Sequence, residues 1–112
     1  MELTFTVSES NGWTVVHVSG DIDVYTAPAL RNKLNETVEG GGHRLVVDLG
    51  DVGFVDSTGL GSLIGVFKHL RSQEGEMRLA AAQPNVVRVI EITGLDKVFD
   101  NQPSVEEATA KP

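Results

Sequence analysis

The segment 54–61, with the sequence FVDSTGLG, places a serine between an aspartate and a threonine at the start of a predicted helix. The Ser57 hydroxyl could cap that helix, because serine is among the favoured N-cap residues. It could also accept a phosphoryl group, since the first turn of a helix stabilises negative charge. At a binding surface, a phosphate beside Asp56 would add like charge, which weakens binding to an acidic partner group. The residues leave both roles open for Ser57.

Three glycines, Gly59, Gly61 and Gly65, fall inside the helix that would begin near Ser57. Each glycine in a helix interior costs roughly 0.5–1 kcal/mol relative to alanine. Their presence indicates that the missing side chains serve a purpose. Either the helix packs closely on the sheet, or the backbone or phosphate of another molecule approaches it here.

A second acidic cluster, Gly20-Asp21-Ile22-Asp23, follows the second predicted strand and precedes the first predicted helix. An acidic turn with a capping aspartate would account for it. If the sheet is parallel, however, this loop and Ser57 emerge at the same edge of the sheet. Asp21, Asp23, Asp56 and Ser57 would then form one negatively charged patch suited to a basic partner surface.

Common enzyme motifs do not fit these residues. A nucleophile elbow needs glycine at position 55, which is Val55, and the only histidine after Ser57 is His69, inside the same helix. A dinucleotide fingerprint fails because Ile64 stands where its third glycine belongs, and the sequence has no phosphate-binding Gly-Lys-Ser or Gly-Lys-Thr. The three histidines are too widely spaced to suggest a metal site. We therefore expect no catalytic residue, cofactor or metal.

Strands and helices alternate along the chain in a pattern that predicts an α/β fold. The first 20 residues alternate like a hairpin around a turn at 10–12, and Thr26 can cap a helix that ends at the glycines 40–42. The short apolar strand 45–49 suits burial on both faces. The remaining expected elements are a helix at 58–72, a strand at 78–81, a helix from Pro84 to Gly94, a brief strand at 98–99 and a tail helix at 104–110. We predict a mixed, mostly parallel sheet with helices against it.

The composition bounds the function of the 112 residues, a length typical of a single domain. The 9 basic and 16 acidic residues give a net charge of −7, which disfavours direct nucleic-acid binding through phosphates and a polybasic membrane anchor. The chain has no cysteine, so disulfides and thiol chemistry are excluded. Because neither a secretory signal nor a spanning segment is recognisable, we expect a cytoplasmic protein.

Taken together, the motifs resemble those of the STAS domain, and specifically of bacterial anti-sigma-factor antagonists. The resemblance covers essentially all of residues 1–112, as a single STAS domain. The motif DSTGLG at 56–61 is its specific part, and it is accompanied by GDID at 20–23, LVVDL at 45–49 and TGLDKVF at 93–99. The resemblance implies a STAS fold, with a mixed sheet of four to five strands and about four helices, laid on one side of the sheet.

The resemblance also implies a partner-switching cycle. The unphosphorylated antagonist would bind an anti-sigma factor with serine kinase activity and release the sigma factor. That kinase would then phosphorylate Ser57 and abolish binding, and a separate phosphatase of the PP2C type would reset the cycle. The residues that the motifs place at the partner interface are Asp21, Asp23, Asp56, Ser57, Thr58 and Gly61. Thr58 is a second candidate acceptor of the phosphoryl group.

Two other functions remain open at this stage. One is a receiver-like domain that is phosphorylated on Asp48, which would need several carboxylates to hold Mg²⁺ and a different opening strand. The other is a STAS interaction scaffold that is never phosphorylated.

Overall fold

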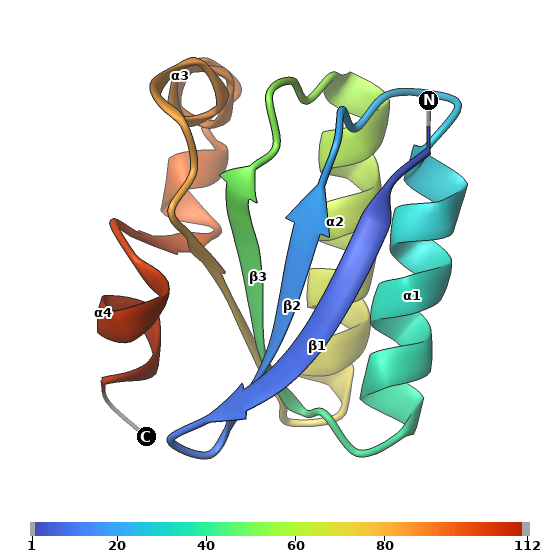
Figure 1. The fold of residues 1–112 in the computed structure, drawn as a ribbon, viewed down its shortest axis with the longest axis vertical. Coiled ribbons are helices and arrows are strands. Elements are labelled where there is room, and N and C mark those ends of the chain that lie inside the picture. Colours follow the sequence, from blue (N-terminus) through green and yellow to red (C-terminus); the bar gives the residue numbers. More distant parts are fainter. Residues whose placement is uncertain (1, 111–112) are drawn as a thin grey trace.

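The computed structural model describes residues 2–110. Its elements, in chain order, are β1 Thr4–Ser10, β2 Trp13–Ser19, α1 Ala27–Glu39, β3 Arg44–Asp51, α2 Ser57–Ser72, β4 Glu76–Ala80, α3 Pro84–Ile92, the 3₁₀ helix η1 Leu95–Lys97, β5 Asp100–Gln102 and α4 Val105–Thr109. The five strands form one sheet in the order β1-β2-β3-β4-β5, in which β1 is antiparallel to β2 and the other pairs are parallel (Figure 1). The predicted α/β fold and mixed sheet are confirmed.

The opening hairpin follows from its turn residues. Asn11 and Gly12 both have positive φ, +52° and +85°, as a two-residue type I′ turn requires. This turn matches the right-handed twist of the two strands, and it pairs Ser10 with Trp13 and Thr4 with Ser19. The alternating pattern in the first 20 residues therefore predicted the hairpin correctly.

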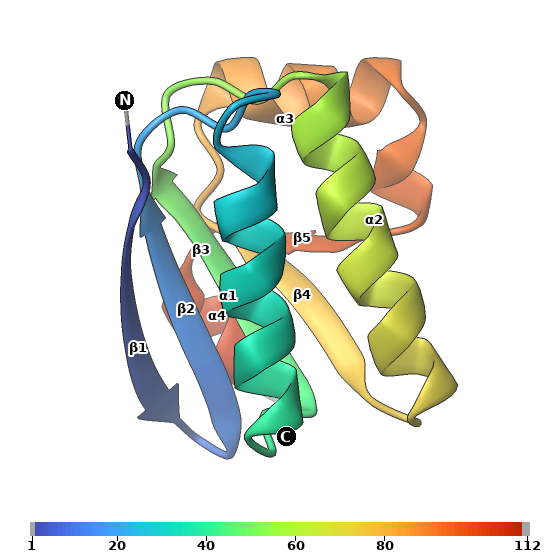
Figure 2. The same ribbon diagram turned by 90° about the vertical axis from the view of Figure 1, so that its right-hand side faces the viewer.

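Helices lie on both faces of the sheet. Helices α1 and α2 stand side by side against one face, while α4 lies behind the sheet in the same view (Figure 2). The one-sided arrangement that the family resemblance implied is wrong, because α4 buries apolar side chains of the second face. The expectation that the strand at 45–49 is covered on both faces is confirmed, since Leu45, Val46 and Val47 are all fully buried.

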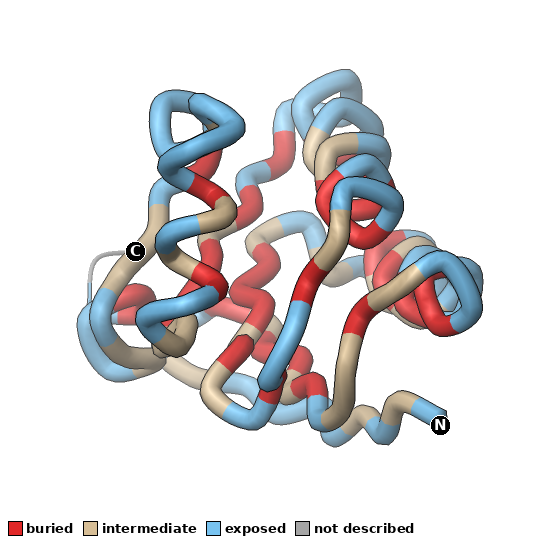
Figure 3. The backbone as a smooth tube through the Cα atoms, turned by 90° about the horizontal axis from the view of Figure 1, so that it is seen from above, coloured by how far each residue is buried: buried red, intermediate tan, exposed pale blue. Residues whose placement is uncertain are grey.

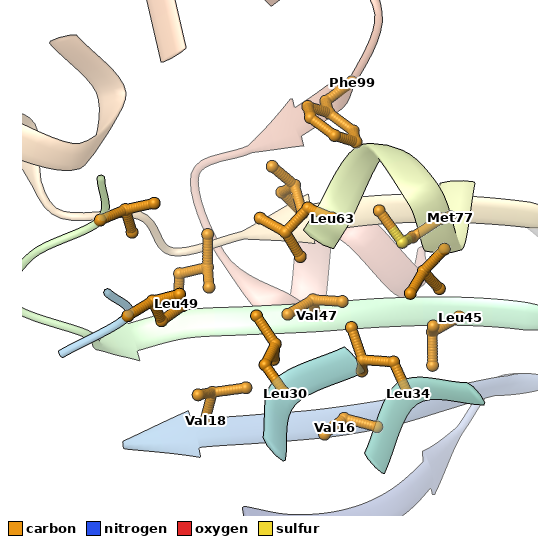
Figure 4. Close-up of a cluster of buried hydrophobic side chains, with 14 of the residues drawn as sticks. Val16, Val18, Leu30, Leu34, Leu45, Val47, Leu49, Leu63, Met77 and Phe99 are labelled. Atoms are coloured by element: carbon orange, nitrogen blue, oxygen red, sulfur yellow. The ribbon is translucent and has the colours of Figure 1, made fainter. Parts of the chain in front are cut away.

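The larger core fills the space between the sheet and helices α1, α2 and α3 (Figure 4). Side chains of β2 and β3 pack there against the inward stripes of the helices. The members labelled in the figure are Val16, Val18, Leu30, Leu34, Leu45, Val47, Leu49, Leu63, Met77 and Phe99. This apolar burial fixes the two long helices on the sheet, and with them the loops that precede each helix.

The smaller core lies under α4 and is centred on Trp13, which is fully buried. The guanidinium carbons of Arg44 and Arg78 lie 4.4 Å and 4.2 Å from the centre of the indole ring, in cation–π contact. Arg78 also donates to the carbonyl of Ala108 at 2.7 Å and pairs with Asp100 at 3.2 Å. These contacts tie α4 to strands β4 and β5.

One expected strand is displaced along the chain. The pattern at 98–99 predicted a strand there, but the strand β5 begins at Asp100. Phe99 instead points into the larger core, where its ring meets the Phe67 ring edge-on with centroids 5.6 Å apart. The apolar signal at Val98 and Phe99 therefore marks a core anchor just before a short, polar edge strand.

Candidate functional site

Two loops at one edge of the sheet are joined directly by backbone hydrogen bonds. Ile22, in the loop before α1, forms an isolated parallel bridge with Val55, in the loop before α2. The amide of Ile22 donates to the carbonyl of Phe54 at 2.8 Å, and the amide of Asp56 donates to the carbonyl of Ile22 at 3.1 Å. The prediction that these loops share an edge is confirmed. Figure 3 looks down on that edge, where exposed backbone alternates with short buried segments.

Helix α2 is capped by Asp56, not by Ser57. Asp56 has an extended backbone, and its carboxylate accepts a hydrogen bond from the amide of Gly59 at 2.9 Å. Ser57 is the first helical residue, one position too late to place its side chain over the first-turn amides. The expectation that the Ser57 oxygen caps the helix is wrong, because the neighbouring carboxylate occupies that role.

The Ser57 hydroxyl is exposed and makes no hydrogen bond within residues 2–110. Thr58 and Gly61 are exposed beside it, on the same end of α2. The amides of Ser57 and Thr58 also donate to no group in the described part of the chain, as expected for the first turn of a helix. An added anion on Ser57 would meet donors and the positive end of the helix dipole.

Asp23 closes the turn that leads into α1, the other helix of the site. Its carboxylate oxygen Oδ1 accepts from the amides of Tyr25 at 2.9 Å and Thr26 at 3.0 Å, and its carbonyl accepts from the amide of Ala27. The hydroxyl of Thr26 accepts in return from the amide of Asp23 at 2.9 Å, which completes a reciprocal capping box. Thr26 occupies the N-cap position of α1, as the sequence suggested, but its hydroxyl bonds to the turn at Asp21 and Asp23 and accepts from no amide of the helix.

These hydrogen bonds affect the charge of Asp23. The bond from the Thr26 amide has the largest effect and lowers the pKa of the Asp23 carboxyl. Desolvation opposes it and comes second, and the bonds from the Tyr25 amide and the Thr26 hydroxyl lower the pKa further. Asp23 is accordingly held as an anion. Asp21, two residues earlier, is half-buried, and the Asp21 carboxylate lies over Gly53, where a Cβ would be 3.2 Å from its oxygen Oδ1.

The three glycines of α2 divide into two kinds. A Cβ on Gly59 would overlap the side chain of Ile22 and approach Val55 to 3.2 Å, so Gly59 permits close packing of α2 on the bridged loops. A Cβ on Gly61 or Gly65 would meet nothing within 4 Å among the described residues. These two leave a bare strip of backbone on the exposed face of the helix. Close packing on the sheet therefore accounts for Gly59, while the approach of another molecule at Gly61 and Gly65 stays a prediction.

Sequence analysis missed three apolar side chains at this edge. Val24, Tyr25 and Phe54 are 55%, 88% and 49% exposed, respectively. They belong to the same two loops as Asp23 and Asp56, so the edge is both apolar and acidic. The sequence could have indicated them, because each is an apolar residue in a predicted loop and belongs to no alternating strand pattern or helical stripe. Such a side chain is one that the fold itself does not bury.

Asp48, the acceptor of the receiver-like alternative, is already engaged. Its carboxylate accepts from the amide of Gly50 at 2.9 Å and lies 2.6 Å from His17 Nδ1. Among residues 2–110, no group of three or more histidine, cysteine or acidic side chains is placed to hold a metal ion. The carboxylate cluster that the receiver alternative requires is therefore missing from this part of the chain. No helix in the same range is long and apolar enough to cross a membrane.

The fold and the spacing of the loop residues agree with a family model described as the STAS domain, which matches residues 4–108. The chain belongs to the STAS domain family. The resemblance seen in the motifs at 20–23, 45–49, 56–61 and 93–99 is thereby confirmed.

Relatives within this STAS family have informative names. An anti-sigma-B factor antagonist of Bacillus subtilis (strain 168) is 38% identical over 100 residues, covering 89% of this chain and 91% of its own. One from Listeria monocytogenes is 39% identical over 85 residues, covering 76% of this chain and 75% of its own. The crystal structure of an anti-sigma factor antagonist from Mycobacterium paratuberculosis superimposes with a TM-score of 0.88 at 37% identity, covering 96% and 92% of the two chains.

Proposed function

We propose that this STAS protein is an anti-sigma-factor antagonist whose binding is controlled by phosphorylation of Ser57. In the unphosphorylated form it binds an anti-sigma factor and frees the sigma factor to join RNA polymerase. The observation that supports this most is the exposed, uncommitted hydroxyl of Ser57, placed by the Ile22–Val55 bridge on one surface with both acidic loops. The relatives named as antagonists support the same function.

The docking surface in this proposal consists of the acidic residues, the exposed start of α2 and the apolar loop side chains. Its members are Asp21, Asp23, Asp56, Ser57, Thr58 and Gly61, with Val24, Tyr25 and Phe54 added by the structure. Exposed aromatic side chains supply buried area on binding, while the carboxylates select a basic partner surface. The bare backbone at Gly61 lets a partner approach α2 closely.

The anti-sigma factor acts as the kinase in this cycle. The γ-phosphorus of ATP forms a bond to Ser57 Oγ, its bond to the bridging oxygen breaks, ADP leaves, and the hydroxyl proton passes to a base of the kinase. The new group carries about −1.5 to −2 charge at pH 7. Within the folded chain it is accepted by the first-turn amides of α2, so the fold is kept.

At the interface the same phosphate opposes binding. A partner site shaped for the small, neutral Ser57 hydroxyl must accommodate a bulky dianion, which does not fit that site and loses its hydration when it is buried there. A phosphatase, of the PP2C type by analogy with the family, restores the hydroxyl by hydrolysis. The STAS protein itself contributes no catalysis in this scheme, and it works in the cytoplasm with its sigma factor.

The experiment combines phosphorylation with binding. The purified chain is incubated with candidate anti-sigma kinases and ATP, and the modified residue is mapped by mass spectrometry. Binding of the same kinases to wild type, Ser57→Ala and Ser57→Asp is measured by calorimetry without ATP. We expect modification at Ser57, unchanged affinity for Ser57→Ala, loss of release by ATP in that variant, and weaker binding of Ser57→Asp.

Ser72→Ala serves as the matched control, because Ser72 is also an exposed serine of α2 but lies at the opposite end of the helix, outside the proposed surface. It should be phosphorylated and released like wild type. Phosphate on another residue while Ser57 stays unmodified would overturn the proposed switch. If an anti-sigma factor binds the chain and still phosphorylates no residue of it when ATP is added, the protein would instead be an interaction scaffold.

A further inference from the structure

The face of the sheet away from α1 and α2 holds a row of three hydrogen-bonded polar side chains. Ser8 Oγ lies 3.0 Å from His17 Nε2, and His17 Nδ1 lies 2.6 Å from Asp48 Oδ2. The other oxygen of Asp48 is fixed by the amide of Gly50 at 2.9 Å. The order is hydroxyl, imidazole, carboxylate, with each group within hydrogen-bond reach of the next.

Strand register produces this arrangement. His17 on β2 pairs directly with Asp48 on β3, so their side chains share a face of the sheet. Thr6 on β1 pairs with His17, and Ser8, two residues further along, therefore points to that same face. Three adjacent strands thus hold the three groups, and the position of each is set by backbone pairing instead of by a flexible loop.

Exposure increases in the order that a reactive serine requires. The Asp48 side chain is 19% exposed and the His17 side chain 36%, while Ser8 is exposed at the edge strand. Helix α4 covers the part of this face around Trp13 and Val46. The hydroxyl is open to a reagent, and the imidazole behind it is oriented by a partly covered carboxylate.

We propose that Ser8 is a nucleophilic modification site that takes an acyl group from small activated donors such as acyl phosphates. A hydroxyl paired with a base, whose other nitrogen is oriented by a third group, is the arrangement that activates serine. Ser8 Oγ forms a bond to the acyl carbon and the bond from that carbon to the leaving oxygen breaks. The serine proton passes to His17 Nε2 and from there to the leaving group.

The site supports one-time acylation and not turnover. Ser8 lies within strand β1 and does not begin a helix whose first-turn amides could stabilise the oxyanion of a reacting ester. The ester would remove the Ser8 hydroxyl from its hydrogen bond with His17. This row of polar side chains is separate from the surface around Ser57.

The test uses p-nitrophenyl acetate as the acyl donor and the full chain. Release of p-nitrophenolate is followed by absorbance, and acetylated residues are mapped by mass spectrometry before and after alkaline hydroxylamine, which removes esters from serine but leaves amides on lysine. We expect one hydroxylamine-sensitive acetyl group at Ser8. His17→Gln should lower its rate of formation by about tenfold or more, because it removes the general base.

Two further variants separate chemistry from folding. Asp48→Asn keeps a similar shape but loses the charge that orients His17, so we expect a smaller loss of rate at Ser8, as fits a positioning residue. Ser10→Ala is the matched control on the same strand: Ser10 bonds to Thr109 and has no imidazole partner, and its loss should leave acetylation at Ser8 unchanged. Circular dichroism of each variant verifies the fold.

Acetylation of Ser8 at the rate seen for Ser10 would overturn the proposal. So would a rate that is the same in wild type and in folded His17→Gln. Because neither result involves the partner or Ser57, failure here would leave the proposed antagonist function untouched.

Discussion

The backbone of Gly59 lies directly against the side chain of Ile22. Any Cβ at position 59 would overlap the methyl group Cγ2 of Ile22 and press on Val55. Since Ile22 and Val55 are also joined by the bridge between the two loops, one contact seats α2, the loop before α1 and the loop before α2 together. The position of Ser57 therefore depends on the absence of a side chain at Gly59, two residues further along the chain.

Gly59→Ala should destabilise the protein, because the added methyl group enters a space already filled by Ile22. Overpacking of this kind typically costs about 1–3 kcal/mol. The free energy of unfolding in urea measures the effect, and a displaced Ile22 should also broaden the NMR signals of Asp56 and Ser57.

Gly65→Ala is the matched control for this substitution. It adds the same methyl group to the same helix, where nothing lies within 4 Å. Removing a helix-interior glycine without a clash should stabilise the protein by about 0.5–1 kcal/mol. Equal effects at positions 59 and 65 would refute the packing role of Gly59.

Asp56→Ala and Ser57→Ala should differ sharply in stability although the residues are adjacent. Asp56 alone caps α2, through the amide of Gly59, and losing an N-cap typically costs about 0.5–2 kcal/mol. Ser57 has an exposed hydroxyl without a partner in the described chain, so its loss should change the unfolding free energy by only a few tenths of a kcal/mol. Thermal and urea unfolding check both. Comparable destabilisation by Ser57→Ala would mean that Ser57 shares the cap.

The sequence predicted the fold well because its signals were local and strong. Alternation with Asn11-Gly12 predicted the hairpin, and the apolar residues Leu60, Leu63 and Leu70 of the helix predicted at 58–72 lie buried on one face of α2. Fine boundaries were weaker. Phe99 looked like a strand residue, yet it is held by its contact with Phe67, a tertiary interaction that no local pattern encodes.

The candidate site was predicted in outline only. Adjacency of the two loops followed from parallel strands, but the choice of cap did not. Serine and aspartate are both good caps, and which of Asp56 and Ser57 takes the role depends on where the helix begins, to within one residue. The apolar members Tyr25 and Phe54 were missed because burial, not residue type, distinguishes a docking side chain from a core side chain.

Tyr25→Ala and Phe54→Ala should weaken binding to the anti-sigma factor without loss of stability. Both side chains are largely solvent-exposed in the free protein, so their removal creates no cavity. Truncating an aromatic contact at the centre of an interface typically costs more than about 1 kcal/mol of binding energy. Calorimetric titration gives the affinities, with Ile92→Ala as the control: Ile92 is 78% exposed and is the last residue of α3, outside the two loops. An equal loss for Ile92→Ala would argue against the proposed surface.

Stability at low pH should depend on Asp23. Hydrogen bonds from Thr26 and Tyr25 lower the pKa of its carboxyl in the folded chain, so the folded state binds this proton less readily than the unfolded state does. The stabilisation from Asp23 is therefore complete above the ordinary carboxyl pKa of about 3.9. It is lost as the pH falls through the lower pKa that Asp23 has in the folded chain. Asp23→Asn retains a capping oxygen but cannot ionise, so its unfolding free energy should fall less steeply between about pH 5 and 2 than that of wild type. Urea unfolding at a series of pH values tests this, with Asp96→Asn, an exposed aspartate of η1, as the comparison. Parallel pH profiles for wild type and Asp23→Asn would show that the capping box does not favour the charged form of Asp23.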